Sequence, residues 1–300
     1  MRILTALLAV FVLANHAAAS DTSPRTVGSA YPYICSGALR DAELADLGGD
    51  IVAASESISV TRKDIEEQIG KAPASVRDQM RRYPVYVLEQ HITRQLTMLE
   101  AGKWAKEAGR DLSSGDVLVQ SYLDAQLPKL TVTDKEAEDF YKERAKLFGG
   151  LPYDRVKDAV VGFMMDEKKR EAEDRFKAGV SRRHKVKVSA SWLASEREKW
   201  AANPVESARV SGKPSFVNFG VIGCCDRMYP IIQDVRASHG RKINVVFVHV
   251  GQEEVLSNLY GVSEIPVQVF LDKDGKELFR HEGFLAEEQV LAKFSEMGVQ

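Results

Sequence analysis

Two adjacent cysteines, Cys224 and Cys225, are the side chains of this 300-residue sequence best suited to chemistry. A thiolate attacks disulfides and binds soft metal ions, and free N–H groups and the helix dipole favour it at a helix N-terminus. The residues that follow, through Pro230 and Val235, have the pattern of a helix that begins at the pair. We therefore expect both thiols to have a lowered pKa and to be the catalytic residues.

The missing spacer between the two cysteines limits what they can do. Neighbouring residues on a helix point about 100° apart. A disulfide between them closes a small ring and strains the intervening peptide bond. Such a strained disulfide is more oxidising. Three interpretations stay open. They are redox exchange with protein substrates, capture of a soft ion such as Cu(I) without a third cysteine or a His cluster to support it, and a structural pair in a binding domain.

A third cysteine, Cys35, stands far upstream. Because the number of cysteines is odd, at least one thiol stays free unless it forms a disulfide with another chain. It is a candidate auxiliary thiol that reaches the pair from the N-terminal arm. The alternatives are a buried small hydrophobe and a link between chains. No metal site is predicted from the wider sequence, and no cofactor is expected.

The cysteine pair lies in a region where short apolar strands alternate with helices. This pattern begins near Lys213. The fully apolar strand Val245–Val248 is expected in the middle of a covered sheet. The predicted elements, in the order strand, helix, strand, helix, strand, strand, helix, are 216–219, 224–235, 245–248, 253–260, 265–270, 277–280 and 287–297.

This region resembles exported thioredoxin-like proteins over its whole length. The matching pieces are Lys213-Pro214, Phe219-Gly220, Met228 with Pro230, Tyr260-Gly261-Val262 before Ile265-Pro266, and Gly275 to Phe284. The resemblance implies an α/β thioredoxin-like domain with thiol-disulfide oxidoreductase activity. In that family the proline matching Pro266 is cis and faces the reactive cysteines. The backbone of its neighbour, here Ile265, would bind an extended substrate.

The chain departs from the family at the site itself. The family has Cys-x-x-Cys, whereas both flanks align here only if the two intervening residues are absent. Cys224 then takes the nucleophile's place and Cys225 the resolving cysteine's; an alignment anchored on Pro230 would leave only Cys225 in a family position. Asn218 replaces a buried aspartate that accepts protons, and Gly223 replaces a tryptophan. The resemblance therefore does not supply an internal base for resolving a mixed disulfide.

Residues 51–193 have mostly helical patterns between two short strands. Thr61 and Asp64 form a capping box that opens the first helix, and the long helices carry apolar residues at three-and-four spacing. We expect the two end strands to pair with each other. The main predicted elements are the strands 58–60 and 184–190 and the long helices 84–109 and 152–181.

This part resembles the N-terminal domain of SurA-type periplasmic chaperones. The similarity is carried by Ile58 to Asp64, Leu88 to Ile92, Val132 to Gly150, and the closing helix up to Val188 and Trp192. It implies a holdase that binds unfolded exported chains. The parvulin prolyl-isomerase domain that usually follows is missing, so isomerase activity is not implied.

The N-terminus has the pattern of a secretory signal peptide. Arg2 is followed by the apolar run Ile3–Leu13 and by Ala17–Ala19, and the run is too short to span a membrane. We expect a soluble, periplasmic protein that does not span the membrane. The predicted division is a signal peptide over 1–19, an irregular arm over 20–50, a helical SurA-N-like chaperone domain over 51–193, a linker over 194–205 and a thioredoxin-like domain over 206–300.

The sequence thus predicts an α+β protein of two domains, one mostly helical and one α/β. Its 41 basic and 43 acidic residues nearly balance, which argues against a nucleic-acid partner. The expected partners are unfolded or cysteine-containing exported proteins, with a membrane thiol-recycling protein as a further candidate. Two function classes remain: an oxidoreductase with an attached client-binding domain, and a non-catalytic chaperone or assembly adaptor that uses the thioredoxin fold to bind peptides.

Overall fold

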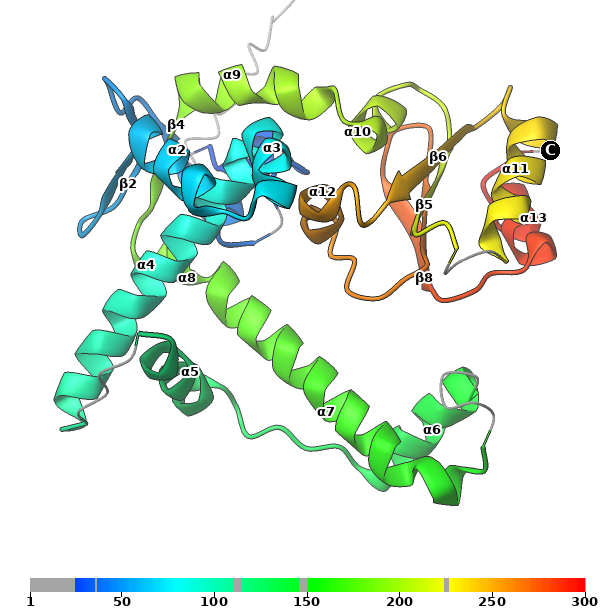
Figure 1. The fold of residues 1–300 in the computed structure, drawn as a ribbon, viewed down its shortest axis with the longest axis horizontal. Helices are drawn as coiled ribbons and strands as arrows, with labels where there is room; N and C mark the ends of the chain where they lie inside the picture. Colours follow the sequence, from blue (N-terminus) through cyan, green and yellow to red (C-terminus); the bar gives the residue numbers. More distant parts are fainter. Residues whose placement is uncertain (1–24, 36, 111–114, 146–150, 224–226, 300) are drawn as a thin grey trace, which may run out of the picture.

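The computed structural model describes residues 25–35, 37–110, 115–145, 151–223 and 227–299. It contains two four-stranded sheets with helices packed against them, and a set of helices that extends away from both (Figure 1). The fold is α+β, as expected. The predicted signal peptide lies outside the described residues.

The first sheet lies in the N-terminal half and has the strand order β1-β4-β2-β3. The two end strands, expected to pair with each other, are both in this sheet, but β2 lies between them and pairs with each. The strands are β1 (Glu43–Ala45), β2 (Ile51–Ala54), β3 (Ser59–Thr61) and β4 (Lys187–Ser189). The helices are α1 (Val27–Ala30), η1 (Ala38–Asp41), α2 (Arg62–Lys71), α3 (Ala74–Arg82), α4 (Pro84–Glu107), α5 (Gly115–Gln126), α6 (Asp134–Arg144), α7 (Tyr153–Ala178), α8 (Val180–Arg183) and α9 (Ala190–Ala201).

Helix starts follow the capping chemistry of the sequence. The Thr61 backbone N–H donates to Asp64 Oδ2 at 2.7 Å, and the Asp64 N–H donates to Thr61 Oγ1 at 3.2 Å. Thr133 and Glu136 form the same reciprocal box at the start of α6. Each box pairs backbone donors that the first helical turn leaves without intrahelical acceptors.

The N-terminal segment is more ordered than the predicted irregular arm. Val27, Ile34 and Leu39 are fully buried in the main core. Glu89 of α4, itself only 3 % exposed, accepts the backbone N–H of Gly37 and of Leu39, each at 3.0 Å. A buried carboxylate thus fixes a segment whose own sequence has no regular period.

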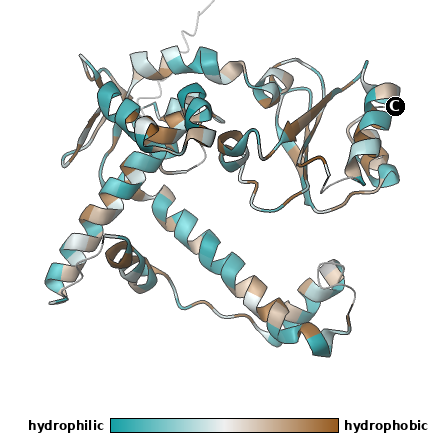
Figure 2. Cartoon of the chain, viewed as in Figure 1, coloured by the Kyte–Doolittle hydropathy of each residue, from teal (hydrophilic) through white to brown (hydrophobic). Residues whose placement is uncertain are grey.

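The helices α5, α6 and α7 form an arm that extends from the N-terminal sheet (Figure 1). Its far end has a small core of its own, made by Ala137, Val156, Val160 and Met164 and separate from the main cluster. Figure 2 shows α7 as largely hydrophilic near the body and more hydrophobic where α6 packs on it. The far end of the arm is therefore held by local contacts between α6 and α7.

A charged cluster around Glu100 of α4 holds the base of the arm. Arg183 donates to both carboxylate oxygens of Glu100 at 2.7 and 3.0 Å, and His184 Nε2 lies 2.9 Å from Oε1. Tyr122 of α5 donates to Glu100 at 3.3 Å, and the Arg183 guanidinium lies 4.3 Å from the ring centre of Phe176 at the end of α7. One carboxylate therefore joins α4, α5, α7 and α8.

Glu100→Gln is expected to loosen this base. Burial raises the pKa of Glu100, but the bonds and charges of Arg183 and His184 outweigh burial, so the pKa lies below its usual range. A carboxyl with a lowered folded pKa stabilises the fold above its unfolded pKa of about 4.3. That stability is lost as the pH falls through the folded value. The variant should lose about 1–3 kcal/mol at pH 7 and raise hydrogen exchange in α5 and α8.

The matched control is Glu67→Gln, which removes an exposed partner of Lys63 and should change the free energy of unfolding by less than about 1 kcal/mol. Equal hydrogen exchange of α5 in Glu100→Gln and the wild-type protein at pH 7 would contradict this role for Glu100.

The second sheet lies in the C-terminal half and has the order β6-β5-β7-β8, with β5 parallel to β6 and the other neighbours antiparallel. Along the chain, the strands and helices from β5 to α13 follow the predicted order. Its elements are α10 (Pro204–Arg209), β5 (Ser215–Gly220), α11 (Met228–His239), β6 (Asn244–His249), α12 (Glu254–Leu259), β7 (Val267–Leu271), β8 (Glu277–Glu282) and α13 (Glu287–Glu296).

The position expected for Val245–Val248 was wrong. These residues form β6, which is an edge strand and not a central one, and most of its side chains are half-buried. The run is apolar because both faces of the sheet are covered even at this edge. Val245 and Phe247 pack with one core cluster, and Val246 and Val248 pack with the other.

The two halves share one hydrophobic core, in which α12 packs on α3. The Val255 N–H donates to Gln79 Oε1 of α3 at 3.0 Å, and Gln79 is buried. Arg82, at the end of α3, donates twice to the Glu253 carboxylate, at 2.9 and 3.1 Å. The C-terminal half therefore packs on the N-terminal half through α12.

The predicted linker, 194–205, is helical instead. α9 continues to Ala201, and α10 begins at Pro204. Trp200, near the end of α9, lies between Tyr83 and Tyr260, with ring centres 5.8 and 6.2 Å away. Ser195, Arg197, Glu198 and Lys199 are exposed, whereas Trp200 on the inner side of the helix joins the two halves.

Candidate functional site

The predicted catalytic residues, Cys224 and Cys225, lie outside the described residues, and both flanks are described. Gly223 precedes them with a φ of +98°, in the left-handed region that glycine tolerates and a tryptophan would not. Arg227 follows as the N-cap of α11. The helix expected to begin at the cysteines is thus described from Met228.

The strand register shows what surrounds this segment. Phe219 of β5 pairs with Val267 at the start of β7, and Val267 pairs with Glu282 at the end of β8. The end of β5, the start of β7 and the end of β8 therefore lie at one end of the sheet. We call this end the cysteine pole. Its described residues are 221–223, Arg227, Ile265, Pro266 and 282–284.

The predicted substrate-binding residues, Ile265 and Pro266, lie at this pole. The peptide bond between them is cis. The Pro266 carbonyl accepts the Gly283 N–H at 2.7 Å. Within the described part of the chain, the Ile265 N–H and C=O have no hydrogen-bond partner. An extended peptide needs such a free donor and acceptor to pair with.

A buried amide pair lies behind the pole. Asn218 and Gln268 are opposite each other on β5 and β7, both with no exposed area. Gln268 Nε2 donates to Asn218 Oδ1 at 3.1 Å. Among described residues, Asn218 Nδ2 and Gln268 Oε1 have no hydrogen-bond partner. The pair can donate and accept hydrogen bonds, but neither amide takes up a proton at neutral pH.

Gln268, Arg227 and Phe284 were missed as candidate site residues by sequence reasoning. A signal existed for Gln268, because it is the one polar residue of the otherwise apolar strand Val267–Leu271. Arg227 carries no sequence pattern of its own, and Phe284 enters the sequence analysis only as the end of the matching piece Gly275 to Phe284. The structure brings them together, with the Arg227 guanidinium 4.0 Å from the centre of the Phe284 ring.

Cys35 is buried in the N-terminal segment, with 3 % of its surface exposed. Burial raises the pKa of its thiol far above the usual range, and the negative charge of Glu89 raises it further. A thiol needs to ionise to attack a disulfide. These properties favour the alternative of a small buried hydrophobe over the auxiliary thiol.

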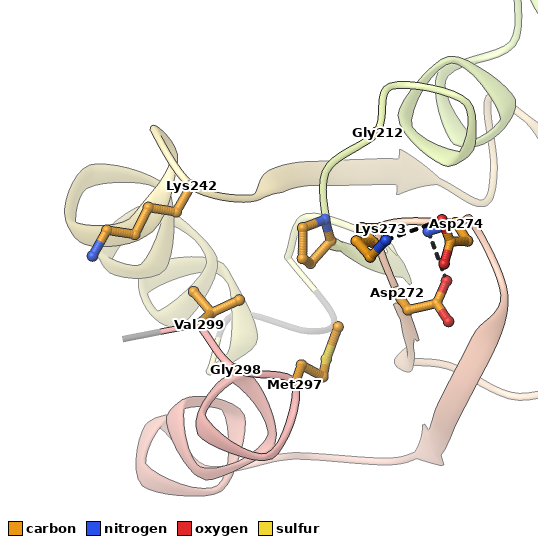
Figure 3. Close-up of a pocket in the computed structure, with 9 residues that line it drawn as sticks. Gly212, Lys242, Asp272, Lys273, Asp274, Met297, Gly298 and Val299 are labelled. Carbon is orange, nitrogen blue, oxygen red and sulfur yellow. Dashed lines mark hydrogen bonds and ion pairs between the residues drawn. The ribbon is translucent and has the colours of Figure 1, made fainter. Parts of the chain in front are cut away.

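A cavity of about 630 Å³ opens at the other end of the second sheet. Figure 3 shows Asp272, Lys273 and Asp274 on one side of it and Met297 to Val299 on the other. Asp272 follows the end of β7, whereas the cysteine pole lies at the start of β7. The cavity is therefore separate from the candidate redox site.

Comparisons with known proteins agree with the topology of the C-terminal half. Residues 202–298 match the family model of a thioredoxin-like domain. Thioredoxin Y of rice chloroplasts (Oryza sativa subsp. japonica) is 34% identical over 83 residues, which are 27% of this chain and 49% of the relative. The chain thus spans about half the length of this curated relative.

Solved thioredoxin structures are also similar to this half. NaTrxh from Nicotiana alata is 23% identical, with 34% of this chain and 86% of that chain covered and a TM-score of 0.29. The exposed lipoprotein thioredoxin Etrx1 from Streptococcus pneumoniae is 20% identical, with 31% and 89% covered and a TM-score of 0.26. Because both TM-scores are below 0.5, the fold assignment rests on the family match and the strand order.

Residues 202–298 are therefore a thioredoxin-like domain. Thioredoxin homology supports a thiol-disulfide oxidoreductase type of function for it. The family match does not reach the N-terminal half, so the SurA-type assignment stays a prediction. No helix within the described ranges is long and apolar enough to cross a membrane.

Proposed function

We propose that this protein is a periplasmic thiol-disulfide oxidoreductase that acts on cysteines of exported proteins, with a SurA-type N-terminal domain that binds the client. The observation that carries the proposal is the cysteine pole of the thioredoxin-like domain. There, the ends of the segment that contains Cys224 and Cys225 lie at the same end of the sheet as Pro266 and the Ile265 backbone, which has no hydrogen-bond partner among the described residues.

In the reducing direction, the Cys224 thiolate attacks one sulfur of a client disulfide. A mixed disulfide forms, and the other client sulfur leaves as a thiolate that takes up a proton. The Cys225 thiolate then attacks the Cys224 sulfur, which releases the second client thiol and leaves a Cys224–Cys225 disulfide. A thiol-recycling partner returns two electrons to the pair. In the oxidising direction every step reverses, and the client loses the electrons.

The N-terminal half supports the client-binding part of the proposal. The arm of α5, α6 and α7 extends away from the body, and the end of the domain with the cysteine pole faces the side on which the arm lies (Figure 1). Leu151 next to α7 and Val117 of α5 are each about half exposed. An unfolded chain offers apolar side chains that such residues contact.

A second candidate function, a non-catalytic adaptor, is favoured by the amide pair. Asn218 and Gln268 are fully buried where a proton acceptor would help to resolve a mixed disulfide. In this version the pole binds client segments and leaves their cysteines unchanged. The soft-metal alternative has no cluster of three or more potential ligands within the described ranges.

Disulfide exchange by the purified full chain separates the two functions. A peptide with an internally quenched disulfide is incubated with the protein and a glutathione buffer, and the fluorescence gain is compared with that of the buffer alone. The oxidoreductase proposal expects exchange well above the glutathione rate. A rate equal to that of glutathione, together with suppressed aggregation of an unfolded client, would establish the adaptor instead.

A further inference from the structure

The two sides of the cysteine pole differ in how much space they leave. On the α12 side, the N-terminal half blocks access of a substrate to the pole. Val255 and Leu256 are buried in the shared core, and Arg82 of α3 binds Glu253, the last residue of the loop between β6 and α12. Ile265 packs against the same core. A substrate that contacts the Ile265 backbone is therefore directed toward the other side of the pole.

The other side exposes large apolar side chains. Ile222 is 57 % exposed, and Phe284 is 37 % exposed. A single exposed apolar residue is ordinary, but these two flank the cysteine segment, one before it on the β5 side and one on the loop after β8. Together with Arg227, they form what we call the pole strip, defined as Ile222, Arg227 and Phe284.

The backbone that carries Phe284 is fixed on both sides. The Gly283 N–H donates to the Pro266 carbonyl at 2.7 Å, and His281 Nε2 lies 3.2 Å from the Phe284 carbonyl oxygen. The Leu285 N–H donates to Met228 Sδ at 3.4 Å. The ring is therefore presented by an ordered loop, so that little conformational entropy is lost when a ligand covers it.

Arg227 adds a charged group that has no acidic partner among the residues that the structure describes. Its guanidinium stacks on the Phe284 ring at 4.0 Å, and no ion pair joins it to another described residue. A stacked guanidinium keeps its in-plane N–H groups free, in a geometry that matches a carboxylate. The strip therefore combines an apolar surface with a directed carboxylate site.

We propose that the pole strip selects extended client segments that carry an aromatic or aliphatic side chain and an acidic side chain beside the reactive cysteine. The apolar side chain packs between Ile222 and Phe284, and the carboxylate pairs with Arg227. The segment's backbone pairs with Ile265. This inference rests on the proposed function for its chemistry, since it names the substrate class of the same site.

Peptide binding tests the strip without any redox step. A fluorescent peptide with serine in place of its cysteine, and with phenylalanine and glutamate beside it, is titrated with the full chain and followed by anisotropy. Replacing its phenylalanine by serine, or its glutamate by glutamine, should each weaken binding to the wild-type protein. Phe284→Ser should weaken binding of the parent peptide about tenfold. Arg227→Gln should remove the preference for glutamate over glutamine.

The matched control is Leu278→Ser, which removes another exposed apolar residue of the same domain, near the start of β8 and away from the pole. It should bind the peptide as the wild-type protein does, and melting curves confirm that each variant folds. Equal affinity for all the peptides, or wild-type binding by both Phe284→Ser and Arg227→Gln, would overturn the inference.

A separate assay keeps this result apart from the proposed function. The wild-type protein is also tested for exchange with 2-hydroxyethyl disulfide, a substrate with no side chains for the strip to recognise. If that exchange does not exceed the uncatalysed rate, the oxidoreductase proposal fails. The peptide preferences still decide whether the strip binds as inferred.

Discussion

Cys224→Ser is expected to reduce disulfide exchange to the rate of the uncatalysed reaction. A serine hydroxyl stays protonated at neutral pH and cannot attack a disulfide sulfur, so the first step of the proposed sequence is lost. Cys225→Ser has a different expected result. It leaves the first step intact and removes the second, so the mixed disulfide between Cys224 and the client accumulates. Non-reducing gels and peptide mass spectrometry detect this species.

The two variants also show which of the two cysteines attacks the client. If Cys225 is the nucleophile instead, Cys224→Ser traps the client and Cys225→Ser is inactive. The control is Cys35→Ala, which should leave exchange unchanged because Cys35 is buried with a raised pKa. Slower exchange by Cys35→Ala would support the auxiliary thiol, and full exchange by Cys224→Ser would contradict its role as nucleophile.

Asn218→Asp is expected to make the stability of the thioredoxin-like domain depend on pH. The new carboxyl would have no exposed area, with one bond from Gln268 Nε2 to favour its charged form. Burial raises the pKa of an acid above its unfolded value of about 3.9. Stability therefore falls as the pH rises from the unfolded pKa to the folded pKa. The loss at neutral pH is on the order of 3 kcal/mol.

The measurement is urea unfolding of the full chain at pH 4.5 and at pH 8. Asn218→Leu is the matched reference, because it has a similar size and cannot ionise, so its difference from the wild-type protein should not vary with pH. At pH values where the aspartate is ionised, it should also speed release of the client from the mixed disulfide, because it can accept a proton. Unfolding curves of Asn218→Asp that match those of Asn218→Leu at both pH values would contradict the buried environment of this position.

The parts of the fold that depend on local chemistry could be predicted from the sequence. Thr61 with Asp64, and Thr133 with Glu136, mark helix starts because the capping partners are only three residues apart. The order of strands and helices around Val217 and Val269 follows from alternating apolar runs. The sequence also predicts a thioredoxin-like domain over 206–300, and residues 202–298 match the family model of such a domain.

The parts that depend on distant contacts could not be predicted. The bond from Gly37 to Glu89 joins residues 52 positions apart, and the bond from Gln268 to Asn218 joins residues 50 positions apart. β6 is apolar like a central strand, but only the sheet order shows that it lies at an edge. The polar stretch after Trp192 has the composition of a linker. It is a helix because Trp200 packs between the two halves.

The redox state of the cysteines tests the central claim most directly. The full chain is equilibrated across glutathione buffers of increasing potential, free thiols are alkylated, and peptides are analysed by mass spectrometry. We expect Cys224 and Cys225 to change from fully labelled to unlabelled together, with one midpoint, while native Cys35 shows no such transition because its thiol is buried. If all three cysteines keep one state across the whole range, the domain is not a redox enzyme and the adaptor function holds.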